Sequence, residues 1–393
     1  MQILENKDNC VGCASCMNIC PKHCIRMEFD IEGFLYPEID DEACIECGLC
    51  KAVCPALNPQ QPNLNKTTAV VGRCHDMHIR RESSSGGFFY YLARWILAKG
   101  GCIYGAAWDR SFNVVHIRCD NEDDIMKLLQ AKYAQSEMGN CFKDIETDLQ
   151  EGKCVLFSGT SCQVGAVKSY LRKDYKNLYL VDIICHGVPS PGVWRRYIDY
   201  RSLKDNGEGS IASINMRCKD TGWPPFSVDI RYLNGHRYLN MKEYDPYMRA
   251  FVHDLCLRKS CHICQYKGIN RVSDLTLGDY WGIWDQMPEF DDGKGTSVVL
   301  IHTDKASEIL EAIKKDFEIR DIDPALSVSE NSSAEHSAPE NPLREEFLKR
   351  VFTEDFEVLV DELSPLPAPK TRSKLDWGIN KIKRAVKLLM GET

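Results

Sequence analysis

Residues 10–21 read CVGCASCMNICP and residues 44–55 read CIECGLCKAVCP, so the pattern C-x2-C-x2-C-x3-C-P occurs twice within the first 55 residues. This spacing holds two 4Fe-4S clusters in bacterial ferredoxins, where the fourth cysteine of each run binds the other cluster. A zinc ribbon needs only paired C-x2-C units, so two matching frames of four cysteines favour iron–sulfur clusters. The pattern therefore predicts one cluster on Cys10, Cys13, Cys16 and Cys54, and a second on Cys44, Cys47, Cys50 and Cys20.

The length and composition bound the class of protein. A chain of 393 residues predicts two or three domains, and 44% hydrophobic content is ordinary for a soluble globular protein. Residues 1–8 are polar and lack the apolar stretch of a secretory signal, and no run approaches the roughly 18 apolar residues of a membrane span. We therefore expect a cytoplasmic protein in which the cysteines at cluster spacing bind metal, and the total of twenty cysteines does not imply disulfides.

The charge is unevenly distributed. The net charge of −8 argues against a nucleic-acid partner. Residues 1–60 carry ten acids and four bases, a face that could steer a basic redox partner or could simply be solvated. A basic helix is expected near the C-terminus, where apolar residues keep helical spacing and basic residues lie between them: Leu375, Ile379, Ile382, Val386 and Leu389, with Lys381, Lys383, Arg384 and Lys387. We hypothesise weak docking of this helix on a membrane or a partner; packing on its own domain is the alternative.

The local patterns divide the chain. The segment between the two cysteine runs alternates apolar and polar residues around a glycine and predicts a short hairpin, which gives a ferredoxin-like domain over residues 1–58. A proline-rich stretch over residues 59–68 is expected to be a linker. The main domain is expected over residues 69–330, and a C-terminal loop and helix over residues 331–393.

Beyond the linker, apolar strands alternate with helices. We expect strands over 68–74, 102–108, 153–159, 178–187 and 298–303, and helices over 82–101, 123–133, 141–152, 165–173, 189–201, 307–317 and 345–352. Residues 211–245 are turn-rich and alternating, which predicts a β-hairpin insertion. The chain is thus predicted to be α/β (α+β overall), with a mostly parallel sheet in the larger domain.

A second group of cysteines is Cys256, Cys261 and Cys264, spaced C-x4-C-x2-C as at the start of a plant-type ferredoxin site. No cysteine follows Cys264, so a fourth ligand must come from upstream, where the candidates are Cys162, Cys185 and Cys218. Cys162 and Cys185 both follow predicted buried strands, at the edge where open α/β sheets bind ligands. Zinc is the competing interpretation of this group. Cys24 lies outside both patterns and is expected to be a packed thiol.

Glycine-rich turns occur at residues 83–87, 99–106 and 158–163, between predicted strands and helices. Neither the G-x-G-x-x-G nor the Walker pattern is present in the sequence. Because backbone amides at a helix N-terminus suit phosphate oxygens, these turns together favour a phosphorylated cofactor.

Several motifs together resemble one family. They are GFLYP (33–37), SSSGGFF (83–89), GGCIYGAAW (100–108), AKYAQS (131–136), LFSGTSCQ (156–163), CHGVPSP (185–191) and SCHIC with SDLTLGDYWG (260–282). From about Cys10 to Trp284 the chain resembles the beta subunit of coenzyme F420-reducing hydrogenases and dehydrogenases, in the form fused to an N-terminal two-cluster ferredoxin. The resemblance implies FAD and an additional 4Fe-4S cluster in the α/β domain.

The resemblance also implies site residues. The expected FAD site comprises Ser84, Ser85, Gly86, Gly87, Lys132, Tyr133 and Ser136. The expected third cluster is bound by Cys185, Cys261 and Cys264, with Cys162 or Cys256 completing it. No catalytic acid or base is assigned; His186 is either a proton carrier or a hydrogen-bonded structural histidine.

The sequence therefore predicts an iron–sulfur flavoprotein oxidoreductase. Its expected partners are a ferredoxin or a hydrogenase or dehydrogenase subunit, together with a small hydride carrier such as coenzyme F420. Two alternatives remain: an electron-transfer subunit without its own substrate, and an accessory protein of surface-polysaccharide biosynthesis.

Overall fold

The structure is a computed structural model that describes residues 2–63, 66–205 and 210–366. The basic helix predicted over residues 375–390 lies outside this range. Within it, no helix is both long enough and apolar enough to cross a membrane.

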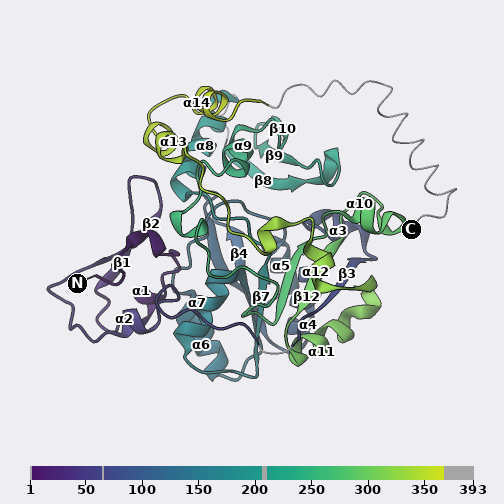
Figure 1. Cartoon of the computed structure of the whole chain (residues 1–393), viewed down its shortest axis with the longest axis horizontal. Helices are drawn as coiled ribbons and strands as arrows, with labels where there is room; N and C mark the ends of the chain where they lie inside the picture. Colours follow the sequence, from purple (N-terminus) through teal and green to yellow (C-terminus); the bar gives the residue numbers. More distant parts are fainter. Residues whose placement is uncertain (1, 64–65, 206–209, 367–393) are drawn as a thin grey trace.

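The two cysteine runs fold into a small N-terminal domain at the left of Figure 1. Two short helices carry the runs, and the hairpin predicted between them is present as an antiparallel pair. The elements are α1 (Ser15–Ile19), β1 (Ile25–Phe29), β2 (Leu35–Ile39) and α2 (Leu49–Ala52).

An eight-stranded sheet in the order β13-β3-β12-β11-β7-β6-β4-β5 forms the centre of the larger part. The neighbours β11, β7, β6 and β4 pair in parallel, and β3 points the same way, so five of the eight strands share one direction. This confirms the predicted fold class. The strands are β3 (Thr68–Cys74), β4 (Cys102–Trp108), β5 (Val114–Cys119), β6 (Val155–Thr160), β7 (Leu178–Ile183), β11 (Leu275–Asp279), β12 (Ser297–Ile301) and β13 (Phe317–Ile322).

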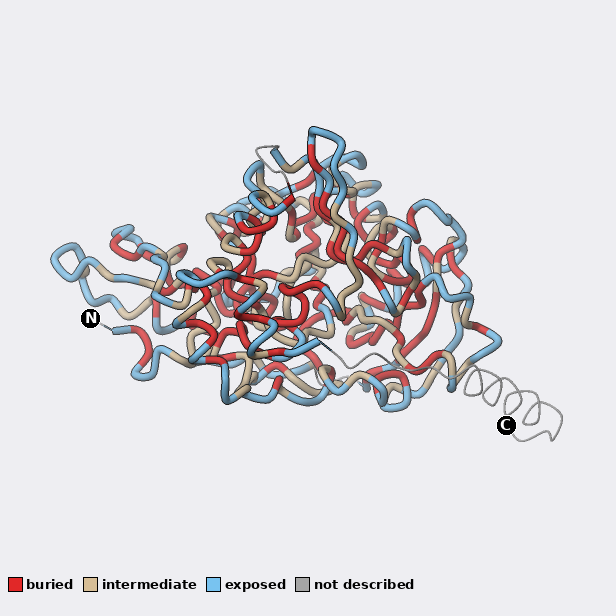
Figure 2. The backbone as a smooth tube through the Cα atoms, turned by 90° about the horizontal axis from the view of Figure 1, so that it is seen from above, coloured by how far each residue is buried: buried red, intermediate tan, exposed pale blue. Residues whose placement is uncertain are grey.

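Helices cover both faces of this sheet, because alternate residues of each buried strand point to opposite sides. Ile103, Leu156 and Val181 pack on one face with α4 (Phe88–Ala98), α5 (Glu122–Leu128) and α11 (Asp304–Ile313). Phe157 and Leu180 pack on the other with α6 (Cys141–Gln150) and α7 (Ser161–Leu171). Three short helices complete this part: α3 (Met77–Glu82), α10 (Ile283–Gln286) and α12 (Pro324–Val328). Figure 2 shows buried residues concentrated inside these layers.

The helix expected over residues 123–133 is shorter than predicted. It ends at Leu128, and Gln130 adopts a left-handed conformation with φ 67°. The Lys132 ammonium donates hydrogen bonds to the carbonyl oxygens of Leu129 and Gln130, which would serve as helix acceptors if the helix continued. Residues 129–136 therefore form a loop over the edge of the sheet.

The predicted insertion is a separate antiparallel sheet of three strands, with its own apolar core. It comprises β8 (Ile211–Cys218), β9 (Ser227–Tyr232) and β10 (Arg237–Met241), covered by α8 (Pro191–Lys204), α9 (Pro246–Val252), α13 (Arg344–Arg350) and α14 (Phe356–Leu363). Phe347 of α13 and Leu359 of α14 join Trp194 of α8 in that core. The segment that carries α13 and α14 therefore continues this layer, whereas Ala334 packs in a separate core with Tyr280 and Val328.

The N-terminal domain is held tightly against the larger part. The Ser190 hydroxyl donates to the Glu32 carbonyl oxygen at 2.6 Å, and the Gly192 amide donates to the Gly33 carbonyl oxygen at 3.0 Å. The buried Arg344 guanidinium pairs with both carboxylate oxygens of Glu32, at 3.1 and 2.7 Å. A Cβ on Gly33, whose φ is +74°, would lie 2.7 Å from the Gly192 Cα.

Replacement of Gly33 by alanine is expected to loosen this contact, because both the left-handed backbone and the missing space oppose a side chain. We expect Gly33→Ala to cost roughly 1–3 kcal/mol and to speed proteolytic cleavage in residues 59–63. Gly152→Ala is the matched control, since Gly152 has φ +81° but no atom within 4 Å of its Cβ position. Equal cleavage rates in the two variants would contradict the close approach.

Candidate functional site

The first four cysteines predicted to act together do lie close to one another. Cys13 and Cys16 are buried at the start of α1 and Cys54 follows α2. Burial and the neighbouring thiolates of Cys16, Cys10 and Cys54 raise the pKa of Cys13 well above its usual value. Such mutual repulsion between thiolates is relieved when a metal centre binds them.

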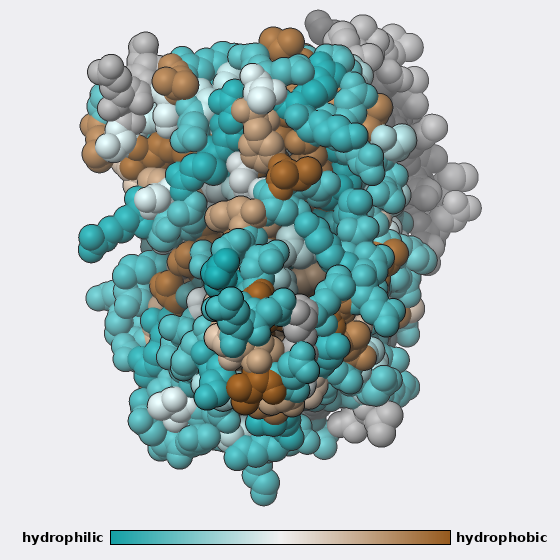
Figure 3. Space-filling model, turned by 90° about the vertical axis from the view of Figure 1, so that its left-hand side faces the viewer, coloured by the Kyte–Doolittle hydropathy of each residue, from teal (hydrophilic) through white to brown (hydrophobic). Residues whose placement is uncertain are grey.

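The second predicted set, Cys20, Cys44, Cys47 and Cys50, lines one small space of about 20 Å³ between α2 and the hairpin. Of the twenty cysteines, all within the described residues, only Cys47 is exposed. Cys24 also borders this space, with its sulfur 3.3 Å from the Cys20 sulfur. Because it contains Cys47, this set is the most accessible of the cysteine groups. The side of the molecule that lies at the left of Figure 1, where the N-terminal domain is, has a mostly hydrophilic surface (Figure 3).

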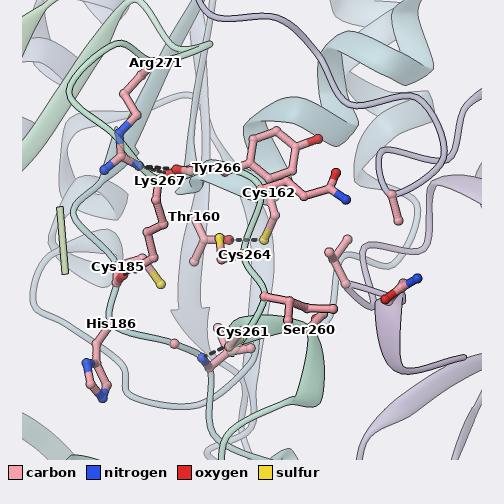
Figure 4. Close-up of a pocket in the computed structure, with 18 residues that line it drawn as sticks. Thr160, Cys162, Cys185, His186, Ser260, Cys261, Cys264, Tyr266, Lys267 and Arg271 are labelled. Carbon is pink, nitrogen blue, oxygen red and sulfur yellow. Dashed lines mark hydrogen bonds between the residues drawn. The ribbon is translucent and has the colours of Figure 1, made fainter. Parts of the chain in front are cut away.

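A third group of cysteines surrounds a cavity of about 50 Å³ at the carboxyl edge of the sheet. Cys162 lies in the first turn of α7, Cys185 follows β7, and Cys261 and Cys264 come from the loop after α9 (Figure 4). Burial raises the pKa of Cys162, Cys185 and Cys261 to about 12, and the thiolates of this group reinforce the shift in each other. The four sulfurs therefore belong to one site, although they come from three separate segments of the chain.

Two of the candidate ligands lie elsewhere. Cys256 is completely buried in the apolar core between β8–β10 and the helices that cover them. The charges that act on it come from Arg344 and Asp254 rather than from other cysteines. Cys218 is buried at the end of β8, where Arg237 contacts both it and Asp229. The geometry therefore brings Cys162 and Cys185 together with Cys261 and Cys264, and leaves out Cys256 and Cys218.

Cations flank the cavity of the four cysteines. The Lys267 ammonium donates to the Cys185 carbonyl oxygen at 2.5 Å and to the Ser333 carbonyl oxygen at 2.9 Å. Arg271 is bound by the Tyr266 and Ala334 carbonyl oxygens and lies 3.7 Å from the Asp182 carboxylate. A positive environment of this kind favours thiolates and anionic metal clusters.

A much larger cavity, of about 490 Å³, opens beside the first. It lies beyond the carboxyl ends of β4, β6, β7 and β11, and the strands β8–β10 and α9 cover it from above. Its volume falls in the range of small-molecule and cofactor sites, and its position is where open α/β sheets bind ligands.

Six of the seven residues expected to hold FAD line this cavity: Ser84, Ser85, Gly87, Lys132, Tyr133 and Ser136. The seventh, Gly86, packs against the sheet instead, because its amide donates to the Ser297 hydroxyl and a Cβ would lie 2.3 Å from the Gly72 carbonyl oxygen. In this loop Ser84, Ser85 and Gly87 therefore face the cavity, while Gly86 packs on β3 and β12.

Sequence reasoning missed several residues of the cavity. Arg217 is buried, pairs with Asp279 at 2.8 Å, and donates to the Ser84 carbonyl oxygen at 3.2 Å. Its Nε atom is buried without a hydrogen-bond partner among the described residues. Lys242 lies over the Phe226 ring, 5.1 Å from its centroid. Asp279 belongs to the quoted motif SDLTLGDYWG, but no local pattern marked Arg217 or Lys242.

His116 is another cavity residue without a signal in the sequence. Burial lowers its pKa to about 4, so the imidazole is neutral near pH 7. Its Nε2 donates to the Ser158 carbonyl oxygen at 3.1 Å, and its Nδ1 accepts from the Ser136 hydroxyl at 2.9 Å. Gln163 in turn donates to the Ser136 oxygen at 2.9 Å, so this chain fixes the orientation of Ser136.

Lys132 is the cation that most strongly indicates an anionic ligand. Its side chain is half-buried, and its ammonium donates only to the carbonyl oxygens of Leu129 and Gln130, with no carboxylate partner among the described residues. Burial lowers its pKa to about 7 from the usual 10.5. An ammonium held partly away from water without a counter-charge is unfavourable unless an anion binds beside it.

The two cavities share a wall. Thr160 and residues 185–188 border both of them, so the same short segment carries one of the four cysteines and faces the larger cavity. His186 in this wall forms a hydrogen bond of 2.6 Å with the Asp254 carboxylate, as expected for a histidine that is held in place by hydrogen bonds. A cofactor in the larger cavity would therefore lie next to a metal centre in the smaller one.

Comparisons with known proteins match the N-terminal domain and the larger part of the chain separately. Residues 152–325 match the family model for the C terminus of the coenzyme F420 hydrogenase/dehydrogenase beta subunit, and residues 9–58 match the 4Fe-4S dicluster domain. The N-terminal region is 46% identical over 48 residues to a 7Fe ferredoxin of Hydrogenibacillus schlegelii, which covers 12% of this chain and 55% of that protein. It is 38% identical over 50 residues to the pyruvate synthase subunit PorD of Methanothermobacter marburgensis, covering 13% of this chain and 52% of that protein. The chain thus spans about half the length of these two relatives.

One solved structure is also similar. A chain from the xenon-derivatized F420-reducing [NiFe] hydrogenase complex of Methanosarcina barkeri superposes with a TM-score of 0.45 and 16% identity, covering 77% of this chain and 92% of that chain.

Replacement of Lys132 by methionine is expected to stabilise the chain when it is stripped of small-molecule ligands. In the folded state the lysine has a pKa of about 7, against about 10.5 when unfolded, so folding penalises the protonated form. The penalty is complete below pH 7 and fades as the pH rises toward 10.5. Chemical unfolding should therefore show a larger gain for Lys132→Met at pH 6 than at pH 9; a gain that does not depend on pH would contradict the unpaired charge.

Proposed function

We propose that this chain, which belongs to the coenzyme F420 hydrogenase/dehydrogenase beta subunit family and carries an N-terminal 4Fe-4S dicluster domain, is an iron–sulfur flavoprotein oxidoreductase. It would pass electrons between a redox partner protein and an organic hydride carrier. The observation that carries this proposal is the shared wall at Thr160 and residues 185–188, which places a four-cysteine site against a cofactor-sized cavity.

In this proposal residues 1–58 form the electron-transfer domain. Cys10, Cys13, Cys16 and Cys54 hold one cluster, and Cys44, Cys47, Cys50 and Cys20 hold the other. The mutual influence of the first four thiols on their pKa values and the common space lined by the second four support this assignment. Cys24 remains outside both ligand sets.

A third 4Fe-4S cluster is proposed on Cys162, Cys185, Cys261 and Cys264. The enclosed position of these four sulfurs and the flanking Lys267 and Arg271 support it. The sequence left the fourth ligand open between Cys162 and Cys256. Cys162 is proposed here, because Cys256 is buried in a different core. A four-sulfur site also suits zinc, and metal analysis distinguishes the two.

FAD is proposed to bind in the larger cavity of the domain over residues 69–330, between the carboxyl edge of the sheet and the strands β8–β10 with α9. Ser84, Ser85 and Gly87 would present backbone and hydroxyl groups to it, and Lys132 would supply the counter-charge for an anionic part of the nucleotide. Bound there, a flavin exchanges hydride in two-electron steps, while iron–sulfur clusters carry single electrons. Coenzyme F420 or a similar deazaflavin is the hydride carrier that the family suggests.

The arrangement of the cysteine groups suggests the order of transfer. The set that contains the exposed Cys47 would exchange electrons with the partner protein. Asn9, Val11 and Ala56, which belong to the loops of the first cysteine set, also line the cavity of the third. Electrons would therefore move from the outer cluster through the inner one to the third cluster, or in the reverse order.

Serine replacement of single cysteines tests the ligand assignment. We expect about twelve irons per anaerobically purified chain, falling by about four in Cys162→Ser or Cys264→Ser, because three cubane clusters are proposed. Cys256→Ser is the matched control, buried in the same chain but outside the site, and should retain about twelve. Iron and acid-labile sulfide analysis measures this; about eight irons in the unaltered chain, or loss of iron in the Cys256 variant alone, would refute the third cluster as assigned.

A further inference from the structure

Arg258 is a completely buried guanidinium at the junction between the N-terminal domain and the four-cysteine site. Its Nε donates to the Cys10 carbonyl oxygen at 2.6 Å, its Nη1 to the Gln135 side-chain oxygen at 3.0 Å, and its Nη2 to the Leu35 carbonyl oxygen at 3.0 Å. The guanidinium also lies over the Tyr36 ring, 4.1 Å from its centroid.

No carboxylate compensates this charge. Among residues 2–63, 66–205 and 210–366, Arg258 makes no ion pair, and its hydrogen-bond acceptors are neutral oxygens. By contrast, Arg344, which also binds the N-terminal domain, is paired with Glu32 through both carboxylate oxygens. A buried charge without a counter-ion is costly, so a structure that retains one normally places an anion near it.

Apart from the Tyr36 phenol that packs on it, the guanidinium lies beside loops that carry cysteines of two proposed ligand sets. A Cβ on Gly12, between Cys10 and Cys13, would lie 2.8 Å from the Arg258 Nη1, so the guanidinium rests directly against the first cysteine loop. On the other side, the Cys261 amide donates to the Arg258 carbonyl oxygen at 2.9 Å. Arg258 and Cys261 therefore belong to one turn of the chain.

We propose that Arg258 is a positioning residue that raises the reduction potentials of the two clusters on either side of it, those of Cys10 and of Cys261. This inference rests on the proposed clusters. Reduction of a cluster adds one electron and makes it more negative, so a fixed neighbouring cation favours the reduced form. Net charge and hydrogen bonding around a cluster are among the factors that set its potential. The outer cluster, around the exposed Cys47, lies away from this charge and would be affected least.

A purely structural role for Arg258 gives a different expectation. Its hydrogen bonds tie Cys10 and Leu35 to Gln135 of the larger part, so its loss could simply loosen the domain junction. Arg344→Gln loosens the same junction by breaking the pair with Glu32, whose hydrogen bonds involve neither Cys10 nor Cys261. It is therefore the matched control for docking.

The test is a dithionite titration of the intact, anaerobically purified chain, followed by electron paramagnetic resonance of each cluster. Arg258→Gln should lower the midpoint potentials of two clusters by about 59 mV or more, the equivalent of a tenfold change in the ratio of reduced to oxidised cluster at a fixed solution potential. Arg258→Lys, which keeps the charge, and Arg344→Gln should leave the potentials near those of the unaltered protein.

A second variant keeps the arginine in place. Gln135→Glu puts a carboxylate against Arg258 and cancels its charge, at the cost of the hydrogen bond from Gln135 to the Val11 carbonyl oxygen. It should lower the same two potentials in the same direction, even where Arg258→Gln does not fold.

Unchanged potentials in Gln135→Glu, or equal shifts in Arg258→Gln and Arg344→Gln, would overturn the proposal. If all three clusters are present and the potentials do not move, this inference fails while the proposed function stands. If the unaltered protein lacks the third cluster, the ligand assignment of the proposed function is itself wrong.

Discussion

The structure depends on holding sulfur ligands close together inside protein. Thiols that face one another in a buried space resist ionisation, because burial and each neighbouring thiolate raise their pKa. A metal centre reverses this preference, so the energy spent on bringing the sulfurs together is recovered when the centre binds. The surrounding framework must therefore be rigid, and in this chain each cysteine group is fixed by hydrogen-bonded loops and short helices. The third group is assembled by the central sheet, since Cys162 and Cys185 follow adjacent parallel strands.

Burial of positive charge complements this arrangement. Lys267 and Arg271 flank the third group, Arg258 separates it from the first, and Lys132 stands unpaired in the neighbouring cavity. Lys132, Lys267 and Arg258 are held mainly by carbonyl oxygens, which orient the charge without cancelling it, whereas Arg271 also faces the Asp182 carboxylate at 3.7 Å. The electrostatics of the interior thus suit anionic cofactors along a continuous path from the N-terminal domain to the carboxyl edge of the sheet.

Much of this could be predicted from sequence where the information is local. The repeated cysteine run, the hairpin between its copies and the alternation of strands and helices each depend on short-range patterns, and the predicted fold class is confirmed. The fourth member of the third cysteine group could not be chosen, because Cys162 and Cys256 differ only in how distant segments pack. Arg217 and Arg258 carry no motif of their own; their importance comes from burial beside Asp279 and beside Cys10. The loop around Lys132 was expected to be helical, because its apolar periodicity gave no sign of the left-handed turn at Gln130.

The central claim is that one chain joins three one-electron carriers to one two-electron carrier. An anaerobic reductive titration that follows cluster and flavin absorbance tests it most directly. The account predicts uptake of about five electrons per chain, one for each of three clusters and two for the flavin, with reduced deazaflavin able to supply them. Uptake of about two electrons, without bleaching of a flavin, would contradict the account and leave only the N-terminal dicluster domain as a redox centre.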